Sequence, residues 1–184
     1  MIAPHLATRR LTLRLAQLGE LDTVTRYWRE NGARYDPPLP AGLLNGEFFH
    51  ERILVNHKDC LEGSAYRLYL FRGSEIVGTL ELSEVVRGFR HKATLGYAIA
   101  GNLEGQGYMS EAVRAAIDFS FRSLNLHRIE ASYSVGNERS SRLLSRLGFV
   151  TEGTLRQFHY NGQQWLDQVA TSLINRDWVP PASE

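Results

Sequence analysis

The feature that most constrains the fold is the glycine pair in Gly105-Gln-Gly107, at the junction of two hydrophobic patterns. The preceding run, Thr94–Ala100, is typical of a strand, and the following run, Met109–Leu124, has apolar residues at helical spacing. Glycine lets a backbone approach a ligand closely, and a helix start offers unpaired N–H groups and partial positive charge. The junction therefore predicts a turn that can bind a phosphate group, although a turn that needs glycine only for steric reasons fits the same residues.

Two nucleotide-binding motifs are excluded at this turn. The dinucleotide fingerprint Gly-x-Gly-x-x-Gly would need a third glycine where the chain has Ser110. The P-loop fails as well, because no Gly-Lys-Ser/Thr follows. If the turn binds a ligand, a site other than a nucleotide triphosphate site must therefore be considered.

Composition narrows the class of protein. With 184 residues and 43% hydrophobic residues, the chain is long and apolar enough for a single folded domain, residues 1–184 with a core at about 9–178. A net charge of +1 predicts no direct nucleic-acid partner. The one cysteine, Cys60, excludes an internal disulfide and is expected to be buried. No metal-binding motif, signal peptide or long apolar segment occurs, so we expect a cytoplasmic protein without a metal or a membrane partner.

The hydrophobic pattern predicts a mixed α/β fold with about seven strands and four helices. Strands are expected at 9–15, 66–72, 76–85, 94–100, 128–135 and on both sides of Asn161-Gly162, a strong hairpin signal. Helices are expected at 20–31, 47–61, 109–124 and after Asn137, where Asn137 or Ser140 can cap a short amphipathic helix. The segment 32–46, with Pro37, Pro38 and Pro40, is expected to be a loop, and two roles fit it: a simple connector, or a connector that also lines a substrate entrance.

Two groups of arginines stand out. Arg9, Arg10 and Arg14 lie close together early in the chain, and Arg139, Arg142 and Arg146 follow one face of the short helix. The second group fits either a solvated helix face or contact with phosphates, which the arginine side chain suits well.

Taken together, Asn102-Leu-Glu-Gly105-Gln-Gly107 and Asn137-x-x-Ser140 resemble the acetyl-CoA-binding core of the GCN5-related N-acetyltransferases. The pyrophosphate loop of that family reads Gln/Arg-x-x-Gly-x-Gly/Ala, and here Asn102 replaces the first residue. Since the family loop works mainly through backbone N–H groups, the change leaves its function intact. The resemblance implies a single-domain fold with a mostly antiparallel mixed sheet, and acetyl-CoA as co-substrate.

Further segments are similar to the branch that acetylates the N-termini of ribosomal proteins, in its alanine-type (RimJ-like) and serine-type (RimL-like) forms. They are Glu84-Val-Val-Arg87-Gly88, Leu95-Gly-Tyr97, Leu147-Gly-Phe149 and Gly162-x-x-Trp165-x-Asp167. The resemblance extends from about Arg9 to Trp178 and implies that the acceptor is the N-terminal α-amine of a protein, with a ribosomal protein as the expected substrate. It also implies an acceptor groove flanked by Glu84–Gly88 and the Asn161–Trp165 hairpin, with the Pro37–Pro40 loop on its far side.

Carried over by position, the family pattern assigns site residues. The expected cofactor-binding residues are Tyr97, Ala98, Ile99, Asn102, Gly105, Gln106, Gly107, Tyr108, Met109, Ser110, Asn137, Ser140 and Arg142. The resemblance implies that Asn137 hydrogen-bonds the pantetheine arm and that Ser140 protonates the departing thiolate. Helix capping is the alternative role for both residues.

The general base stays open. Serine-type relatives have a glutamate on the strand before the final hairpin, where this chain has His159. Either His159 or Glu81, acting through a water molecule, fits the role. An α-amine has a pKa of about 8 and is partly neutral at pH 7, so a strong base is not required.

Two other functions share these motifs. The acceptor can instead be a small amine, such as a polyamine or an amine-bearing antibiotic, or the chain can be a non-catalytic CoA-binding module. An acidic acceptor site would favour a polyamine, whereas neutral and polar groups would favour a peptide.

Overall fold

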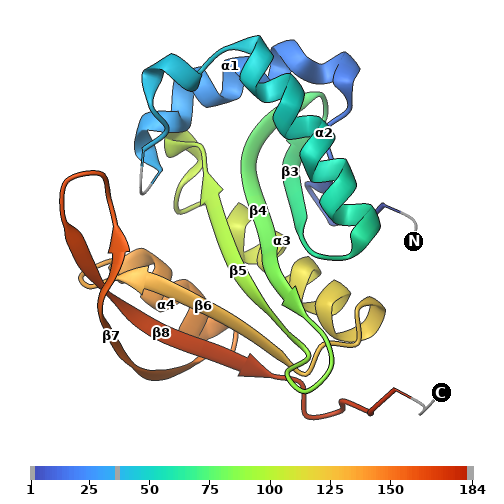
Figure 1. Ribbon diagram of the computed structural model, residues 1–184, viewed down its shortest axis with the longest axis vertical. Helices are drawn as coiled ribbons and strands as arrows, with labels where there is room; N and C mark the ends of the chain where they lie inside the picture. The colour runs from blue at the N-terminus through green and yellow to red at the C-terminus, as the bar shows by residue number, and fades with distance from the viewer. Residues whose placement is uncertain (1–2, 36–37, 182–184) are drawn as a thin grey trace.

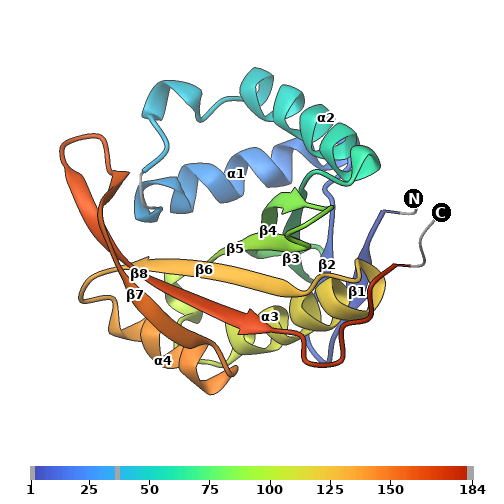
Figure 2. The ribbon, with the colours of Figure 1, turned by 60° about the horizontal axis from the view of Figure 1, so that its bottom comes forward.

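The computed structural model describes residues 3–35 and 38–181, and its centre is an eight-stranded sheet with helices on both faces (Figures 1 and 2). The strands are β1 (His5–Ala7), β2 (Thr12–Arg14), β3 (Tyr66–Arg72), β4 (Glu75–Val86), β5 (Lys92–Ile99), β6 (Arg128–Ser134), β7 (Val150–Tyr160) and β8 (Trp165–Ile174). The helices are α1 (Leu21–Asn31), α2 (Gly46–Glu62), α3 (Tyr108–Asp118) and α4 (Glu138–Arg146). The strand order is β1-β2-β3-β4-β5-β6-β8-β7, and every neighbouring pair is antiparallel except β5 with β6.

The predicted fold class is confirmed, and the expected number of strands is one too low. The additional strand is β1, whose three residues pair with β2. It is missing from the sequence prediction because so short a strand shows no alternation of its own. The predicted strand at 9–15 is shorter in the structure, where β2 covers Thr12–Arg14. Of the prolines in the predicted loop, Pro37 lies outside the described residues.

The predicted helix at 109–124 is also corrected. Regular α-helix ends at Asp118, and Phe119–Ser123 forms a π-helical turn. At this point the Ser120 hydroxyl donates a hydrogen bond to the Ala116 carbonyl at 2.7 Å, a side-chain bond that competes with the regular backbone pattern.

The two faces of the sheet carry separate hydrophobic clusters. On one face, Leu80 and Leu82 pack with α3, and on the other Tyr69 and Phe71 pack with α1 and α2. Successive side chains of a strand point to opposite faces, so alternate residues of β3, β4 and β5 belong to different halves of the molecule. Figure 2 shows α1 and α2 on one side of the sheet and α3 and α4 on the other. Cys60 is buried, as predicted.

Strands β5 and β6 pair over only part of their length. Lys92–Thr94 pair with Arg128–Glu130, whereas the pairing of β5 with β4 continues to Ile99. Beyond Thr94 the two strands diverge, as Figure 1 shows, and one edge of β5 has no partner strand. The sheet is therefore continuous where β5 and β6 pair and is divided between these two strands beyond Thr94.

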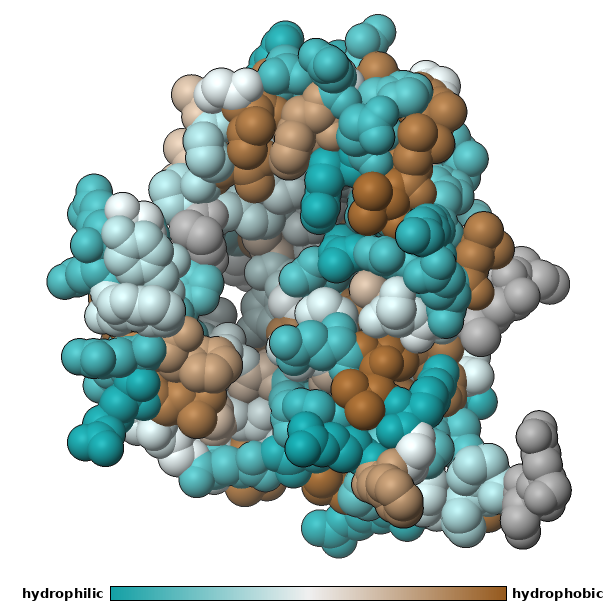
Figure 3. Space-filling view, viewed as in Figure 1, coloured by the Kyte–Doolittle hydropathy of each residue, from teal (hydrophilic) through white to brown (hydrophobic). Residues whose placement is uncertain are grey.

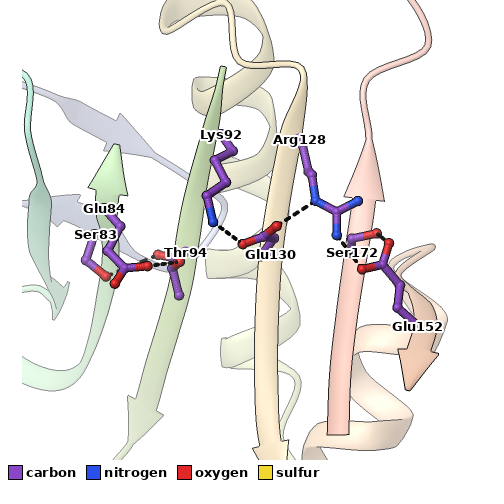
Figure 4. Close-up of polar contacts among 8 residues, drawn as sticks. All are labelled: Ser83, Glu84, Lys92, Thr94, Arg128, Glu130, Glu152 and Ser172. Carbon is purple, nitrogen blue, oxygen red and sulfur yellow. Dashed lines mark hydrogen bonds and ion pairs between the residues drawn. The ribbon is translucent and has the colours of Figure 1, made fainter. Parts of the chain in front are cut away.

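A polar ladder crosses the sheet where β5 and β6 are still paired (Figure 4). Glu130 on β6 contacts both Lys92 on β5 and Arg128, the latter at 2.8 Å. Arg128 also pairs with Glu152 on β7, which accepts a hydrogen bond at 2.6 Å from Ser172 on β8. The ladder thus holds four strands together at the closed end of the division.

Candidate active site

A cavity of about 620 Å³ lies where β5 and β6 diverge. It is lined by both strands, by α1 and α2, and by residues from the start of α4 and from β7. Figure 3 shows the surface hollowed between the β7–β8 hairpin and the rest of the molecule. Because its lining comes from both faces of the sheet, the cavity joins the α1–α2 side to the α3–α4 side.

The wall on the α4 side brings together three predicted residues, Tyr97, Asn137 and Ser140. Burial raises the pKa of Tyr97, and the neighbouring Ser140 hydroxyl opposes that shift. The Tyr97 hydroxyl has no hydrogen bond of good geometry with any part of the chain that the structure describes. A buried hydroxyl that faces a cavity without a firm partner is suited to bind a ligand there.

Helix capping, the alternative role for Asn137 and Ser140, is present. The Asn137 Oδ1 accepts a hydrogen bond from the Ser140 backbone N–H at 3.1 Å. This cap uses the oxygen of Asn137 and the backbone of Ser140. It leaves the Asn137 NH₂ group and the Ser140 hydroxyl for other contacts.

The glycine turn has the backbone shape that its sequence predicts. Gly105 and Gly107 have φ values of 74° and 80°, in the left-handed region that favours glycine. Gly107 is the N-cap of α3, and no side chain caps this helix. The first N–H groups of α3 therefore have no side-chain partner at a place suited to a pyrophosphate. Met109 is only 9% exposed and packs in the core, so only its backbone can serve a ligand.

Arginines from distant parts of the chain surround this turn. The Arg10 guanidinium lies 4.1 Å from the Tyr108 ring centroid, donates to the Gln106 carbonyl at 3.0 Å and pairs with Glu111 at 2.7 Å. Sequence patterns could not reveal this contact, because about a hundred positions separate its partners.

Glu104, just before the turn, pairs with two further arginines. One is Arg34, at 2.7 Å, and the other is Arg139 on α4. Of the three α4 arginines, Arg139 thus contacts the segment beside the turn, whereas Arg142 and Arg146 are exposed.

On the α1–α2 side, strand register sets the positions of Glu81 and Arg67. Glu81 on β4 lies opposite Arg67 on β3 and Gly96 on β5. A Cβ atom at Gly96 would lie 3.1 Å from the Glu81 Cγ, so the glycine leaves room for the glutamate side chain. The Glu81 carboxylate is 3.4 Å from the Arg67 guanidinium. Both side chains line the cavity, as does His159.

The rest of this half is largely aromatic, which the sequence did not predict. The Tyr35 hydroxyl is 2.7 Å from the Thr79 hydroxyl and 3.0 Å from that of Tyr27. Burial raises the pKa of Tyr35 to about 12, so this phenol stays neutral near pH 7. Trp28 packs against Tyr35 and donates to the Tyr69 hydroxyl at 3.1 Å. These residues are scattered in the sequence and show no motif.

The structure brings some predicted site residues into one wall and leaves others outside it. Those in the cavity wall are Glu81, Tyr97, Ala98, Asn137, Ser140 and His159. Those outside it are Ile99, Asn102, Gly105, Gln106, Gly107, Tyr108, Met109, Ser110 and Arg142.

Two of the expected flanks of the acceptor groove lie outside the cavity wall. The segment Glu84–Gly88 lies at the β4–β5 turn, where Glu84 accepts a hydrogen bond from Thr94 at 2.8 Å, and it does not line the cavity. The hairpin tip, Asn161–Trp165, is also outside the wall, although His159 on the same hairpin lines it. Register places these segments at strand ends, away from the division between β5 and β6.

Residues 3–35 and 38–181 contain no cluster of His, Cys, Asp or Glu side chains that could hold a metal ion. No helix within the same residues is long and apolar enough to cross a membrane.

Comparisons with known proteins agree with this architecture. Residues 10–150 match the family model described as an acetyltransferase (GNAT) domain. The chain is 35% identical to the [ribosomal protein uS5]-alanine N-acetyltransferase of Escherichia coli, over 96% of this chain and 93% of that protein. It is 34% identical to a spermidine N(1)-acetyltransferase of Vibrio cholerae, over 48% of this chain and 51% of that protein. The crystal structure of a ribosomal-protein-S5-alanine acetyltransferase from Vibrio fischeri superposes with a TM-score of 0.89 at 29% identity, covering 98% of this chain and all of that one.

Proposed function

This chain belongs to the acetyltransferase (GNAT) family, and we propose that, as an acetyl-CoA-dependent N-acetyltransferase, it acetylates the N-terminal α-amine of a ribosomal protein. The observation that carries the proposal is the cavity at the division between β5 and β6, whose lining residues come from both faces of the sheet. It gives donor and acceptor separate approaches to one point, as direct transfer in a ternary complex requires. The reaction would take place in the cytoplasm, with residues 9–178 acting as one catalytic domain.

The donor would bind on the α3–α4 side. The backbone N–H groups from Gly105 to Ser110 would hold the pyrophosphate, with support from the arginines around the turn. The unpaired edge of β5, at Tyr97, Ala98 and Ile99, would hydrogen-bond the pantetheine arm in place of a neighbouring strand. This arrangement directs the thioester into the division between the strands.

The transfer step follows from the groups in the cavity wall. The neutral amine attacks the thioester carbon, a C–N bond forms and the C–S bond breaks. Ser140 donates its proton to the departing thiolate and then regains one from solvent, and the buried Tyr97 hydroxyl beside it is placed to orient the donated proton. The proton released by the amine passes through water to Glu81, whose carboxylate lines the acceptor side. Asn137 positions the pantetheine amide through its free NH₂ group.

Charge in the acceptor half favours a peptide over a polyamine. The described lining residues include three arginines, Arg34, Arg52 and Arg67, and a single carboxylate, that of Glu81. This carboxylate is already paired with Arg67. A polycation would meet like charge here, whereas an N-terminal amine brings at most one positive charge, which it loses before attack. The similarity to a spermidine acetyltransferase therefore does not extend to a polyamine site of acidic character.

The test is an acetyl-transfer assay on peptides that each carry a free N-terminus and one internal lysine. Peptides beginning with Ala, Ser and Met would be compared with N-formylated copies and with spermidine, and products would be located by mass spectrometry. We expect acetylation of the free N-terminus, best with Ala or Ser, and none of the formylated copies. Label mainly on lysine or only on spermidine would contradict the proposal.

A further inference from the structure

Building on the proposed function, we infer that α2 carries a second acceptor subsite, in which Arg52 and Asn56 bind an acidic side chain and the adjoining backbone within the first four residues of the acceptor peptide. The two residues are one helical turn apart, and both line the cavity. The ligand class is thus a peptide N-terminus that carries a nearby Asp or Glu.

Arg52 differs from the other two arginines of the cavity. Arg34 pairs with Glu104, and Arg67 pairs with Asp59 and Glu81. Arg52 has no ion pair with any carboxylate in the part of the chain that the structure describes. Tyr69, which also lines the cavity, senses the charge of Arg52. Burial raises the pKa of Tyr69, and the positive charge of Arg52 acts in the opposite direction. An unpaired guanidinium in a cavity wall is a good receptor for a carboxylate.

Asn56 supplies an independent observation. Its side chain is only 6% exposed, and its Oδ1 makes no hydrogen bond within the described chain. Buried polar atoms are nearly always hydrogen-bonded, so an exception beside a cavity points to a ligand. The amide can rotate to present either its oxygen or its NH₂ group, which are the groups that pair with a peptide backbone. Asn56 therefore fits the main chain beside the residue whose carboxylate binds Arg52.

Strand spacing indicates which peptide residue reaches this subsite. Tyr69 on β3 lies opposite Thr79 on β4, which lies opposite Ala98 on β5, so two strand spacings separate Tyr69 from the division. At about 4.8 Å per strand this is roughly 10 Å. An extended peptide advances by about 3.3–3.6 Å per residue. A peptide whose amine lies at the division therefore reaches Tyr69, which packs with α2, by about its fourth residue.

The experiment compares kcat/KM for peptides that begin with Ala and carry Glu, Gln or Lys at position 2, 3 or 4. At one of these positions we expect the wild-type protein to prefer Glu over Gln by roughly tenfold, the scale of one charge-assisted hydrogen bond. Arg52→Gln should abolish that preference, and Arg52→Glu should shift it towards Lys. Asn56→Ala should raise KM for every peptide while kcat is retained. The Glu preference should also weaken as salt is added.

Lys58→Gln is the matched control, because it removes the same charge from the same helix. The Lys58 side chain is 72% exposed, pairs with Glu62 and does not line the cavity. This variant should keep the wild-type preference. Equal rates for Glu, Gln and Lys peptides would overturn the subsite and leave N-terminal acetylation intact. If no peptide is acetylated at its N-terminus and only spermidine or lysine is, the proposed function itself fails together with the subsite.

Discussion

At the level of single residues, the structure separates the capping role of Asn137 and Ser140 from the proposed role in acetyl transfer, which the sequence could not do. The side chain of Asn137 caps α4, and Ser140 takes part in this cap only through its backbone N–H. Removing the Ser140 hydroxyl therefore leaves the cap in place. A change in stability and a change in turnover can now be assigned to different atoms.

We predict that Ser140→Ala lowers kcat by roughly tenfold or more, the lower range of general-acid effects, with little change in Tm. Asn137→Ala should instead lose about 1 kcal/mol of stability, because it removes the cap. Steady-state kinetics and thermal unfolding on both variants test the pair. Ser145→Ala, at an exposed position of the same helix, is the control. Unchanged turnover in Ser140→Ala would rule out the proton-donor role.

At the level of elements, the turn from β5 into α3 combines two left-handed glycines with an uncapped helix start. Side chains are disfavoured at both glycines, and the N–H groups that follow need a partner. The arginines that surround the turn come from β1–β2, from the segment after α1, and from α4. A turn that the sequence predicts locally is thus surrounded by arginines from three other parts of the chain.

We predict that Gly107→Val weakens CoA binding by at least tenfold, because a branched side chain would occupy the space of the phosphate oxygens and strain a φ of 80°. Calorimetric titration with CoA measures the effect. Gly73→Val matches the backbone strain, since Gly73 has a φ of 62° in the β3–β4 turn with no atom near its Cβ position. It should lose stability but bind CoA normally. Wild-type affinity in a folded Gly107→Val protein would refute the site.

At the level of the whole molecule, the polar ladder of Figure 4 connects β5, β6, β7 and β8 at the end of the sheet where β5 and β6 are still paired. Burial disfavours ionisation of Glu130, but hydrogen bonds from Lys92 and Arg128 outweigh burial and hold the pKa of Glu130 below its usual value. Arg128 and Ser172 lower the pKa of Glu152 in the same way. A carboxyl group with a lowered folded-state pKa stabilises the protein above its unfolded pKa, near 4.3, and this contribution disappears as the pH falls through the folded value.

We predict that Glu130→Gln lowers Tm by about 2–4 °C at pH 7, which corresponds to about 1 kcal/mol in a chain of this size. The difference from wild type should shrink below pH 4, as the wild-type carboxylate becomes protonated. Thermal unfolding between pH 3 and 7 provides the measurement. Glu30→Gln, at an exposed residue, should show neither effect. A Tm difference that stays constant with pH would mean that the ladder contributes by packing rather than by charge.

Local patterns in the sequence determined most elements and several of the residues that the structure places in the cavity wall. The glycine turn, the Asn137 cap and the Asn161-Gly162 hairpin are confirmed, because each depends on residues within a few positions of one another. The first strand of the prediction and the length of the third helix were less accurate, since the strand is shorter at the sheet edge and a π-helical turn follows Asp118.

Only the tertiary structure decided how these parts form a site. The division between β5 and β6, the placement of Glu81 over Gly96, and the contacts of Arg10 with the glycine turn depend on strand order and register. Arg52 and Asn56 were not singled out in the sequence, and they become candidates for ligand binding only because both line the cavity. The physical reason is that periodicity and capping act over one or two turns of chain, whereas a cavity is built from side chains that meet only when distant strands pair.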